Sequence, residues 1–166
     1  MIKKYSQLNI SQVAAQRGYN IGPVYHGTNA ASFNIFKGMW NYRFEAESGT
    51  SYFSDNLQVA KGYGKRIIEV FLCFKNPLIV DAKGEHWTII QPPALVEAKK
   101  EGKDGVILKN ILDTPAGVSE QLCTNYITFT NQFPSQIKLA DVVTFNRGVE
   151  IPLSERFNLN NPDIRY

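Results

Sequence analysis

The chain has 166 residues, of which 43% are hydrophobic and 20% are charged, and its formal net charge is +3. This length and composition predict one globular domain that buries its own core, and they exclude a membrane-spanning helix, because no apolar run approaches the roughly 20 residues that a bilayer requires. The mild positive charge permits phosphate-rich partners but does not argue for them.

The cysteine and histidine content predicts neither a disulfide framework nor a metal site. Only two cysteines are present, Cys73 and Cys123, and Cys73 lies in an apolar strand-like run. His26 and His86 have no ligand-forming neighbours at metal-binding spacing. The basic start of the chain lacks the apolar stretch of a secretory signal. A reducing, cytoplasmic environment is therefore expected.

The predicted elements alternate irregularly between helices and short strands. In chain order they are a helix at 5–17, a strand at 23–28, helical turns at 29–37, a loop at 38–50, a strand at 51–53 and a helix at 55–63. There follow strands at 65–74 and 76–81, helices at 86–90 and 94–102, a strand at 104–108, a long loop at 110–121, and strands at 125–130 and 135–145.

This order predicts an α+β fold with a split, mainly antiparallel sheet and flanking helices. No internal repeat or domain boundary is evident, so residues 1–166 are expected to form one domain. Residues 1–22 would be an N-terminal helical segment, and the polar residues 147–166 would be a surface tail.

His26 is the first candidate for a binding site. It follows an apolar strand and precedes Gly27, where a ligand could approach the backbone. An imidazole in this position could hydrogen-bond a ribose or an amide. A structural histidine that caps a turn is the alternative.

Two tyrosines form the second candidate. Tyr52 lies in a strand-like run, and Tyr63 lies eleven residues later at the end of a helix-like run. A strand, a turn and a returning helix could bring the rings together around a flat cationic ring, held by stacking and cation–π attraction. The alternative is that both are ordinary core or surface aromatics. The chain has no Gly-rich phosphate loop and no nucleophile elbow around a serine.

Taken in order, these motifs resemble the ADP-ribosyltransferase superfamily, in the branch of diphtheria toxin and the poly(ADP-ribose) polymerases. The His-Tyr-Glu triad of that branch is matched by a His-Gly-Thr, by a Gly-x-x-Tyr-Phe, and by a strand after a long loop, at His26-Gly27-Thr28, Gly49–Phe53 and Asn125–Phe129. The resemblance implies that NAD would be bound by His26, Gly27, Thr28, Tyr52, Phe53, Ser54 and Tyr63.

A narrower resemblance is to the ADP-ribosyltransferase domains of phage and mobile-element polyvalent proteins. It rests on the stretches KNPLIVDAKGEHW, DGVILKNILDT and SQIKLAD and on the ending IPLSERFNLNNPDIRY. It implies an effector or toxin that acts in the host bacterial cytoplasm.

The sequence departs from the family at the third triad position, where Asn125 replaces the catalytic glutamate. A neutral amide can hydrogen-bond a ribose hydroxyl but cannot stabilise a cation by charge. Gln136, or Glu120 in the loop, could take over this role. Ala60 is a second departure, because the polymerases often carry a serine there.

The resemblance therefore implies a mono-ADP-ribosyltransferase with NAD as co-substrate, no metal, and catalytic residues His26, Tyr52 and Asn125. NAD hydrolysis could accompany transfer. The acceptor would be a host protein or a nucleic acid, which the sequence does not identify. Because Asn125 is neutral, a catalytically inactive module that binds NAD, ADP-ribose or a protein is the alternative.

Overall fold

A computed structural model describes residues 7–40, 44–115, 117 and 119–166. Its centre is a seven-stranded sheet in the order β4-β5-β6-β2-β1-β3-β7. These strands are β1 (Ile21–Thr28), β2 (Ser51–Ser54), β3 (Arg66–Leu72), β4 (Leu78–Asp81), β5 (Gly105–Asp113), β6 (Gln121–Thr128) and β7 (Ile137–Leu139). The helices are α1 (Gln7–Gln16), α2 (Leu57–Tyr63) and α3 (Trp87–Lys100). Short 3-10 turns occupy η1 (Glu45–Glu47), η2 (Pro134–Gln136) and η3 (Leu153–Glu155), and β8 (Phe145–Asn146) pairs with β9 (Val149–Glu150).

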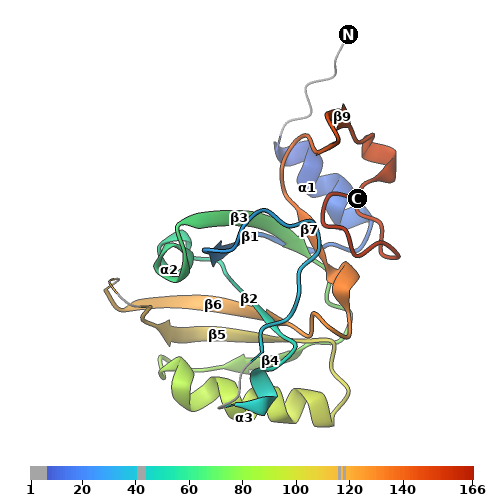
Figure 1. Cartoon of the computed structure of the whole chain (residues 1–166). Coiled ribbons are helices and arrows are strands. Elements are labelled where there is room, and N and C mark those ends of the chain that lie inside the picture. Colours follow the sequence, from blue (N-terminus) through green and yellow to red (C-terminus); the bar gives the residue numbers. More distant parts are fainter. Residues whose placement is uncertain (1–6, 41–43, 116, 118) are drawn as a thin grey trace.

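The predicted α+β class with a split, mainly antiparallel sheet is confirmed. All neighbouring strands are antiparallel except β4 and β5, which are parallel. The split lies between β1 and β2, which share the single register pair Tyr25–Ser54. In Figure 1, β1, β3 and β7 diverge there from β2, β6 and β5.

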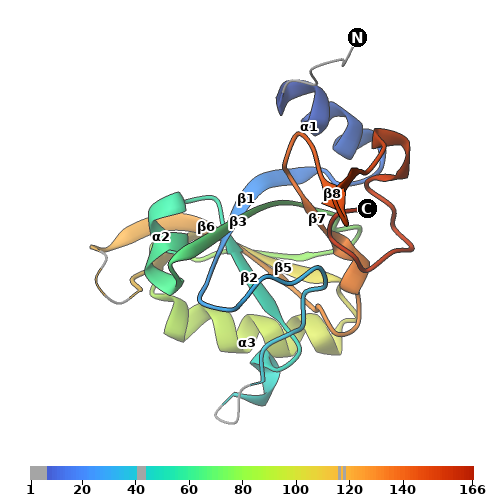
Figure 2. The same cartoon turned by 45° about the horizontal axis from the view of Figure 1, so that its top comes forward.

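Helix α3 covers one face of the β4-β5-β6 half, as both views show (Figure 1, Figure 2). Its buried residues Ala94, Leu95 and Ala98 pack against strand residues such as Val106, Leu108 and Ile127. Val106 and Leu108 alternate with Ile107, which belongs to a second buried cluster, as the period of two in a strand requires. The sequence predicts two helices here, at 86–90 and 94–102. The structure joins them into one helix that includes Pro92 and Pro93, although a proline inside a helix has no N–H to donate to the preceding turn.

The opposite face of the sheet is covered by irregular segments. Phe36, from the segment between β1 and η1, and Ile164, near the C-terminus, are both buried against Phe53, Ile68 and Val70. The sequence predicts helical turns at 29–37, but this segment contains no helix. Phe36 is buried without a helix, because the aromatic contacts of Phe33 with Phe36 and of Phe36 with Phe53 fix the segment.

The third core joins α1 to the C-terminal segment. Ile10 and Ala14 of α1 pack with Tyr19, Phe71 and Phe157. The helix matches the expectation for 5–17 as far as it is described, since residues 5 and 6 lie outside the described residues. Residues 147–166 lie beside α1 (Figure 1), and through Phe157 they form part of this core as well as of the surface.

Two strand predictions differ from the structure in length. The strand expected at 135–145 is limited to β7, Ile137–Leu139. The strand expected at 104–108 continues to Asp113, so the first four residues of the loop predicted at 110–121 belong to β5. The register shifts between Leu108 and Ile111, and Asn110 has a φ of 52°. This bulge interrupts the alternation by which a strand is recognised in a sequence.

Candidate functional site

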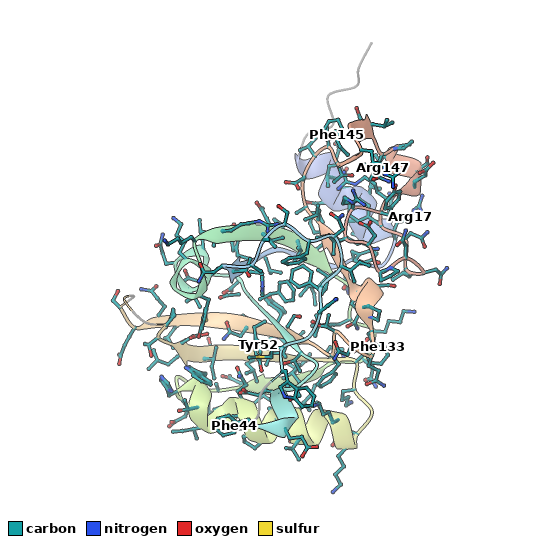
Figure 3. All side chains as sticks on the ribbon, in the orientation of Figure 1. Arg17, Phe44, Tyr52, Phe133, Phe145 and Arg147 are labelled. Carbon is teal, nitrogen blue, oxygen red and sulfur yellow. The ribbon has the colours of Figure 1, made fainter. Side chains whose placement is uncertain are left out.

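A cavity of about 660 Å³ opens beside the split in the sheet. Its walls come from β1, β2, α2, the segment after β1, the first turns of α3, and residues of β5 and β6. Figure 3 places Tyr52, one of the lining residues, near the middle of the molecule. The cavity is lined by all seven residues expected to bind NAD and by the expected third triad residue: His26, Gly27, Thr28, Tyr52, Phe53, Ser54, Tyr63 and Asn125.

His26 connects the two strands at the split. Its Nδ1 lies 2.7 Å from the carbonyl oxygen of Tyr52. A carbonyl only accepts, so Nδ1 carries the hydrogen and Nε2 is left as an acceptor in the neutral ring. Burial lowers the pKa of His26, and Arg66 adds to this effect. The imidazole is thus a neutral acceptor at neutral pH, supported by Phe36 and Phe53 at ring distances of 5.0 and 5.3 Å.

The two tyrosines line the same cavity from different elements. Tyr52 lies on β2, and Tyr63 is the last residue of α2. Burial raises the pKa of each phenol, and the hydrogen bond to Asp113 and the charge of Asp113 add to the effect on Tyr63. Tyr63 remains 50% exposed. Both hydroxyls are therefore neutral at physiological pH, and the rings offer apolar faces to a ligand.

Gly27 permits a close approach of α2 to β1. A Cβ at Gly27 would lie 1.8 Å from the carbonyl oxygen of Ala60, and a Cβ at Gly64 would lie 2.3 Å from the backbone of Thr28. The sequence suggests that Gly27 leaves room for a ligand. The structure fills that room with the backbone of α2, so the glycine acts first in packing.

Thr28, Phe53 and Ser54 support the site through local contacts. The Thr28 hydroxyl accepts from the backbone N–H of Ala30, and the Ser54 hydroxyl accepts from that of Asn56. Phe53 is only 2% exposed and lies in the core. The N-cap of α2 is Asn56, whose side chain accepts from the backbone N–H of Gln58.

Asn125 is buried on β6 and paired with a carboxylate. Its Nδ2 donates to Asp113 Oδ2 at 2.7 Å, and Cys123 Sγ lies 3.3 Å from its Oδ1. Asp113 Oδ1 accepts from the Tyr63 hydroxyl at 2.6 Å. One carboxylate thus joins the second tyrosine to the residue at the third triad position.

The two alternatives considered for that position lie elsewhere. Gln136 is a buried residue of η2 whose Nε2 donates to the Asp104 carbonyl, 3.0 Å away. Glu120 is exposed in the loop before β6. Neither is among the residues that line the cavity.

Sequence reasoning missed two acidic residues of the cavity, Asp113 and Glu47. Both are 4% exposed, and Glu47 accepts from Gln91 Nε2 of α3 at 3.0 Å. Asp113 stood in a segment taken for a loop. The continuation ILD after the polar pair Lys109-Asn110 is the signal that could have extended β5 to it.

In the part of the chain that is described, no group of three or more histidine, cysteine, aspartate or glutamate residues could hold a metal ion. Over the same residues, no helix combines the length and the apolar character needed to cross a membrane.

Comparison with known protein families gives a match over part of the chain. Residues 20–91 match the family model described as ADP-ribosyltransferase in polyvalent proteins. No curated protein and no solved structure matches the chain. The matched segment carries His26, Tyr52 and Tyr63, whereas Asp113 and Asn125 lie beyond it.

Proposed function

We propose that the chain is an NAD-dependent mono-ADP-ribosyltransferase, because residues 20–91 match the family model described as ADP-ribosyltransferase in polyvalent proteins. The observation that carries this proposal is the single cavity lined by His26, Tyr52, Tyr63 and Asn125, with His26 hydrogen-bonded to the Tyr52 carbonyl. The volume of about 660 Å³ falls within the range of sites for small molecules and cofactors.

The proposed role of each residue follows from its chemistry. Nε2 of neutral His26 accepts a hydrogen bond from a ribose hydroxyl, and the Tyr52 and Tyr63 rings flank the nicotinamide ring. The backbone of Gly27 hydrogen-bonds the nicotinamide amide. Asn125 contacts the ribose from β6. Thr28, Phe53 and Ser54 hold these groups in place through the contacts described above.

The proposed reaction is a dissociative substitution at the anomeric carbon of the ribose. The bond from this carbon to the pyridinium nitrogen breaks, and its electron pair leaves with nicotinamide, which becomes neutral. The ribose ring takes the positive charge. A lone pair of the acceptor then forms the new bond, and the acceptor releases its proton to solvent. Water as the acceptor gives NAD hydrolysis at the same site.

A second candidate function is a catalytically inactive module that binds NAD, ADP-ribose or a protein. The neutral side chain of Asn125 favours it, because the amide gives no charge stabilisation to the ribosyl cation. Both candidate functions use the same cavity, but only the transferase would cleave NAD.

The setting proposed for this activity is the cytoplasm of a bacterial host, with the protein acting as an effector encoded by a phage or mobile element. The match to polyvalent proteins supports this setting. The proposed acceptor is a host protein or nucleic acid.

Incubation of the purified protein with isotopically labelled NAD and bacterial lysate tests the proposal. Mass spectrometry should detect ADP-ribose on a protein or nucleic acid, together with free nicotinamide. NAD binding without either product would favour the binding module. Free nicotinamide and ADP-ribose without a modified acceptor would favour hydrolysis. If a titration of the protein with NAD shows no binding, both the transferase and the hydrolase are contradicted, and only a module that binds ADP-ribose or a protein remains.

A further inference from the structure

Asp113 is a buried carboxylate that the proposed roles above do not use. It is 4% exposed, lies at the end of β5 and lines the cavity. The Tyr63 hydroxyl donates to one of its oxygens at 2.6 Å, and the Asn125 amide donates to the other at 2.7 Å. Both partners are donors, so both oxygens act as acceptors, which is the pattern of an ionised carboxylate.

The negative charge of Asp113 has no cationic partner among the described residues. The two salt bridges found among them join other residues, Lys103 with Glu101 and Arg165 with Asp163. Lys37 is the only lysine or arginine among the described residues that line the cavity. A buried charge without a partner is costly, so a cation that enters the cavity would offset that cost.

We propose that Asp113 is the anionic group of this site, which makes the cavity prefer ligands with a positively charged ring and replaces the charge that Asn125 lacks. This inference rests on the proposed function. The carboxylate is hydrogen-bonded to one residue assigned to the nicotinamide ring and to one assigned to the ribose. It therefore lies where positive charge moves from ring to ribose as the glycosidic bond breaks and nicotinamide takes the electron pair.

Glu47 is the competing source of negative charge, and it provides a matched control. It is as buried as Asp113 and lines the same cavity. Its Oε1 accepts from Gln91 of α3, so its hydrogen bond leads away from Tyr63 and Asn125. If the preference for a cation arises from Asp113, neutralising Glu47 should leave it in place.

Calorimetric titration with nicotinamide and with 1-methylnicotinamide tests the role of the charge, because the two rings have similar shapes and differ by one positive charge. The parent protein should bind the cation at least about tenfold more tightly, as expected for opposite charges a few ångströms apart. Asp113→Asn should remove this preference, whereas Glu47→Gln should keep it. The neutral ligand should bind the parent and Asp113→Asn with similar affinity.

A double variant guards against a purely structural effect. Asp113→Asn combined with Asn125→Asp moves the carboxylate to the neighbouring strand and retains an Asp–Asn pair. It should recover the preference for the cation, and it decides the question if Asp113→Asn alone does not fold. A folded double variant without the preference would overturn the proposal, as would a preference that disappears in Glu47→Gln.

The same titrations separate this inference from the function on which it rests. A parent protein that binds NAD but does not distinguish the two rings would overturn the role of Asp113 and leave the transferase proposal standing. A parent that binds neither NAD nor either ring would overturn both. Circular dichroism of every variant should confirm that it is folded.

Discussion

His26 donates from Nδ1 to the carbonyl oxygen of Tyr52 across the split between β1 and β2, over 2.7 Å. The backbone ladder between these strands has one register pair, so the imidazole contributes a contact that the ladder does not. The same ring leaves Nε2 as an acceptor. His26 therefore stabilises the sheet through Nδ1 and is a candidate to bind NAD through Nε2.

We expect His26→Ala to weaken NAD binding strongly and to lower the free energy of unfolding by about 1–3 kcal/mol. A buried hydrogen bond and the packing against Phe36 and Phe53 are both lost. Titration with NAD and urea denaturation measure the two effects. His86→Ala is the matched control, since His86 caps α3 outside the cavity. It should lower stability but keep NAD affinity, and equal NAD affinity in His26→Ala and the parent would remove His26 from the site.

The ring of Tyr63 and its hydroxyl are expected to have separable effects. Tyr63→Ala should weaken NAD binding by roughly 1–3 kcal/mol, because stacking and apolar contact are lost. Tyr63→Phe keeps the ring and removes only the hydrogen bond to Asp113, so most of the affinity should remain. Calorimetry with NAD measures both. If the two variants bind equally well, the ring does not stack on the ligand.

Asn125→Ala should slow transfer sharply and leave NAD affinity nearly unchanged, because the contact of Asn125 with the ribose strengthens as the ribose gains positive charge.

Asn125→Glu, which restores the glutamate of the family, should have an effect that depends on pH. Asn125→Glu would place a second carboxylate beside Asp113, with which Asn125 now shares a 2.7 Å hydrogen bond. Two adjacent carboxylates raise the pKa of one of them. The initial rate of nicotinamide release from NAD in Asn125→Glu should therefore rise only above the pH at which the second carboxylate ionises.

Combining Asn125→Glu with Asp113→Asn provides the control, since it removes the repulsion. The pH–rate profile of the double variant should then shift to lower pH than that of Asn125→Glu. Identical profiles would show that the two carboxylates do not interact.

Lys138 should make stability depend on pH. It is 1% exposed, and its Nζ donates to the backbone carbonyls of Asn161 and Asp163. Burial lowers its pKa to about 8, against the opposing charge of Asp163, from an ordinary 10.5. Between these pH values the unfolded chain holds a proton that the folded chain has lost, so the free energy of unfolding rises with pH. Below pH 8 the folded protein bears the cost of the buried charge.

Urea denaturation of the parent and of Lys138→Met from pH 7.5 to 9.5 measures this contribution. The parent should gain stability relative to the variant by up to about 1.4 kcal/mol per pH unit, because only the parent has this titrating group. Tyrosines with raised pKa values, such as Tyr52 and Tyr63, affect both proteins alike. A constant difference across this range would show that Lys138 does not change its charge there.

The sequence allowed the fold class to be predicted, together with eight of the residues that line the cavity. The long apolar run at 65–74 identified β3 as a buried strand. The resemblance to the ADP-ribosyltransferases named His26, Tyr52 and Tyr63, which line one cavity. What remained hidden depends on contacts between distant parts of the chain. Phe36 is buried without a helix around it, because Phe33 and Phe53 hold it.

The sequence analysis did not identify Asp113 as a site residue because of a local irregularity in β5. The bulge at Lys109-Asn110 divides β5 into two short runs, so Asp113 was assigned to a loop. No pattern within the sequence links it to Tyr63, fifty residues away. Glu47 was missed in the same way, since its partner Gln91 lies on α3.

The contact of Gly27 with Ala60 and of Gly64 with Thr28 also determines how the second tyrosine would meet a ligand. Backbone lies against backbone at both ends of the contact, so α2 has little freedom to shift on β1. The Cα of Tyr63, at the end of this helix, is held in position before any ligand arrives. The entropic cost of ordering α2 and Tyr63 therefore arises during folding. Ligand binding does not include this cost, so its free energy is more favourable. Enlarging either glycine should thus weaken NAD binding through loss of preorganisation, even where the ring itself is intact.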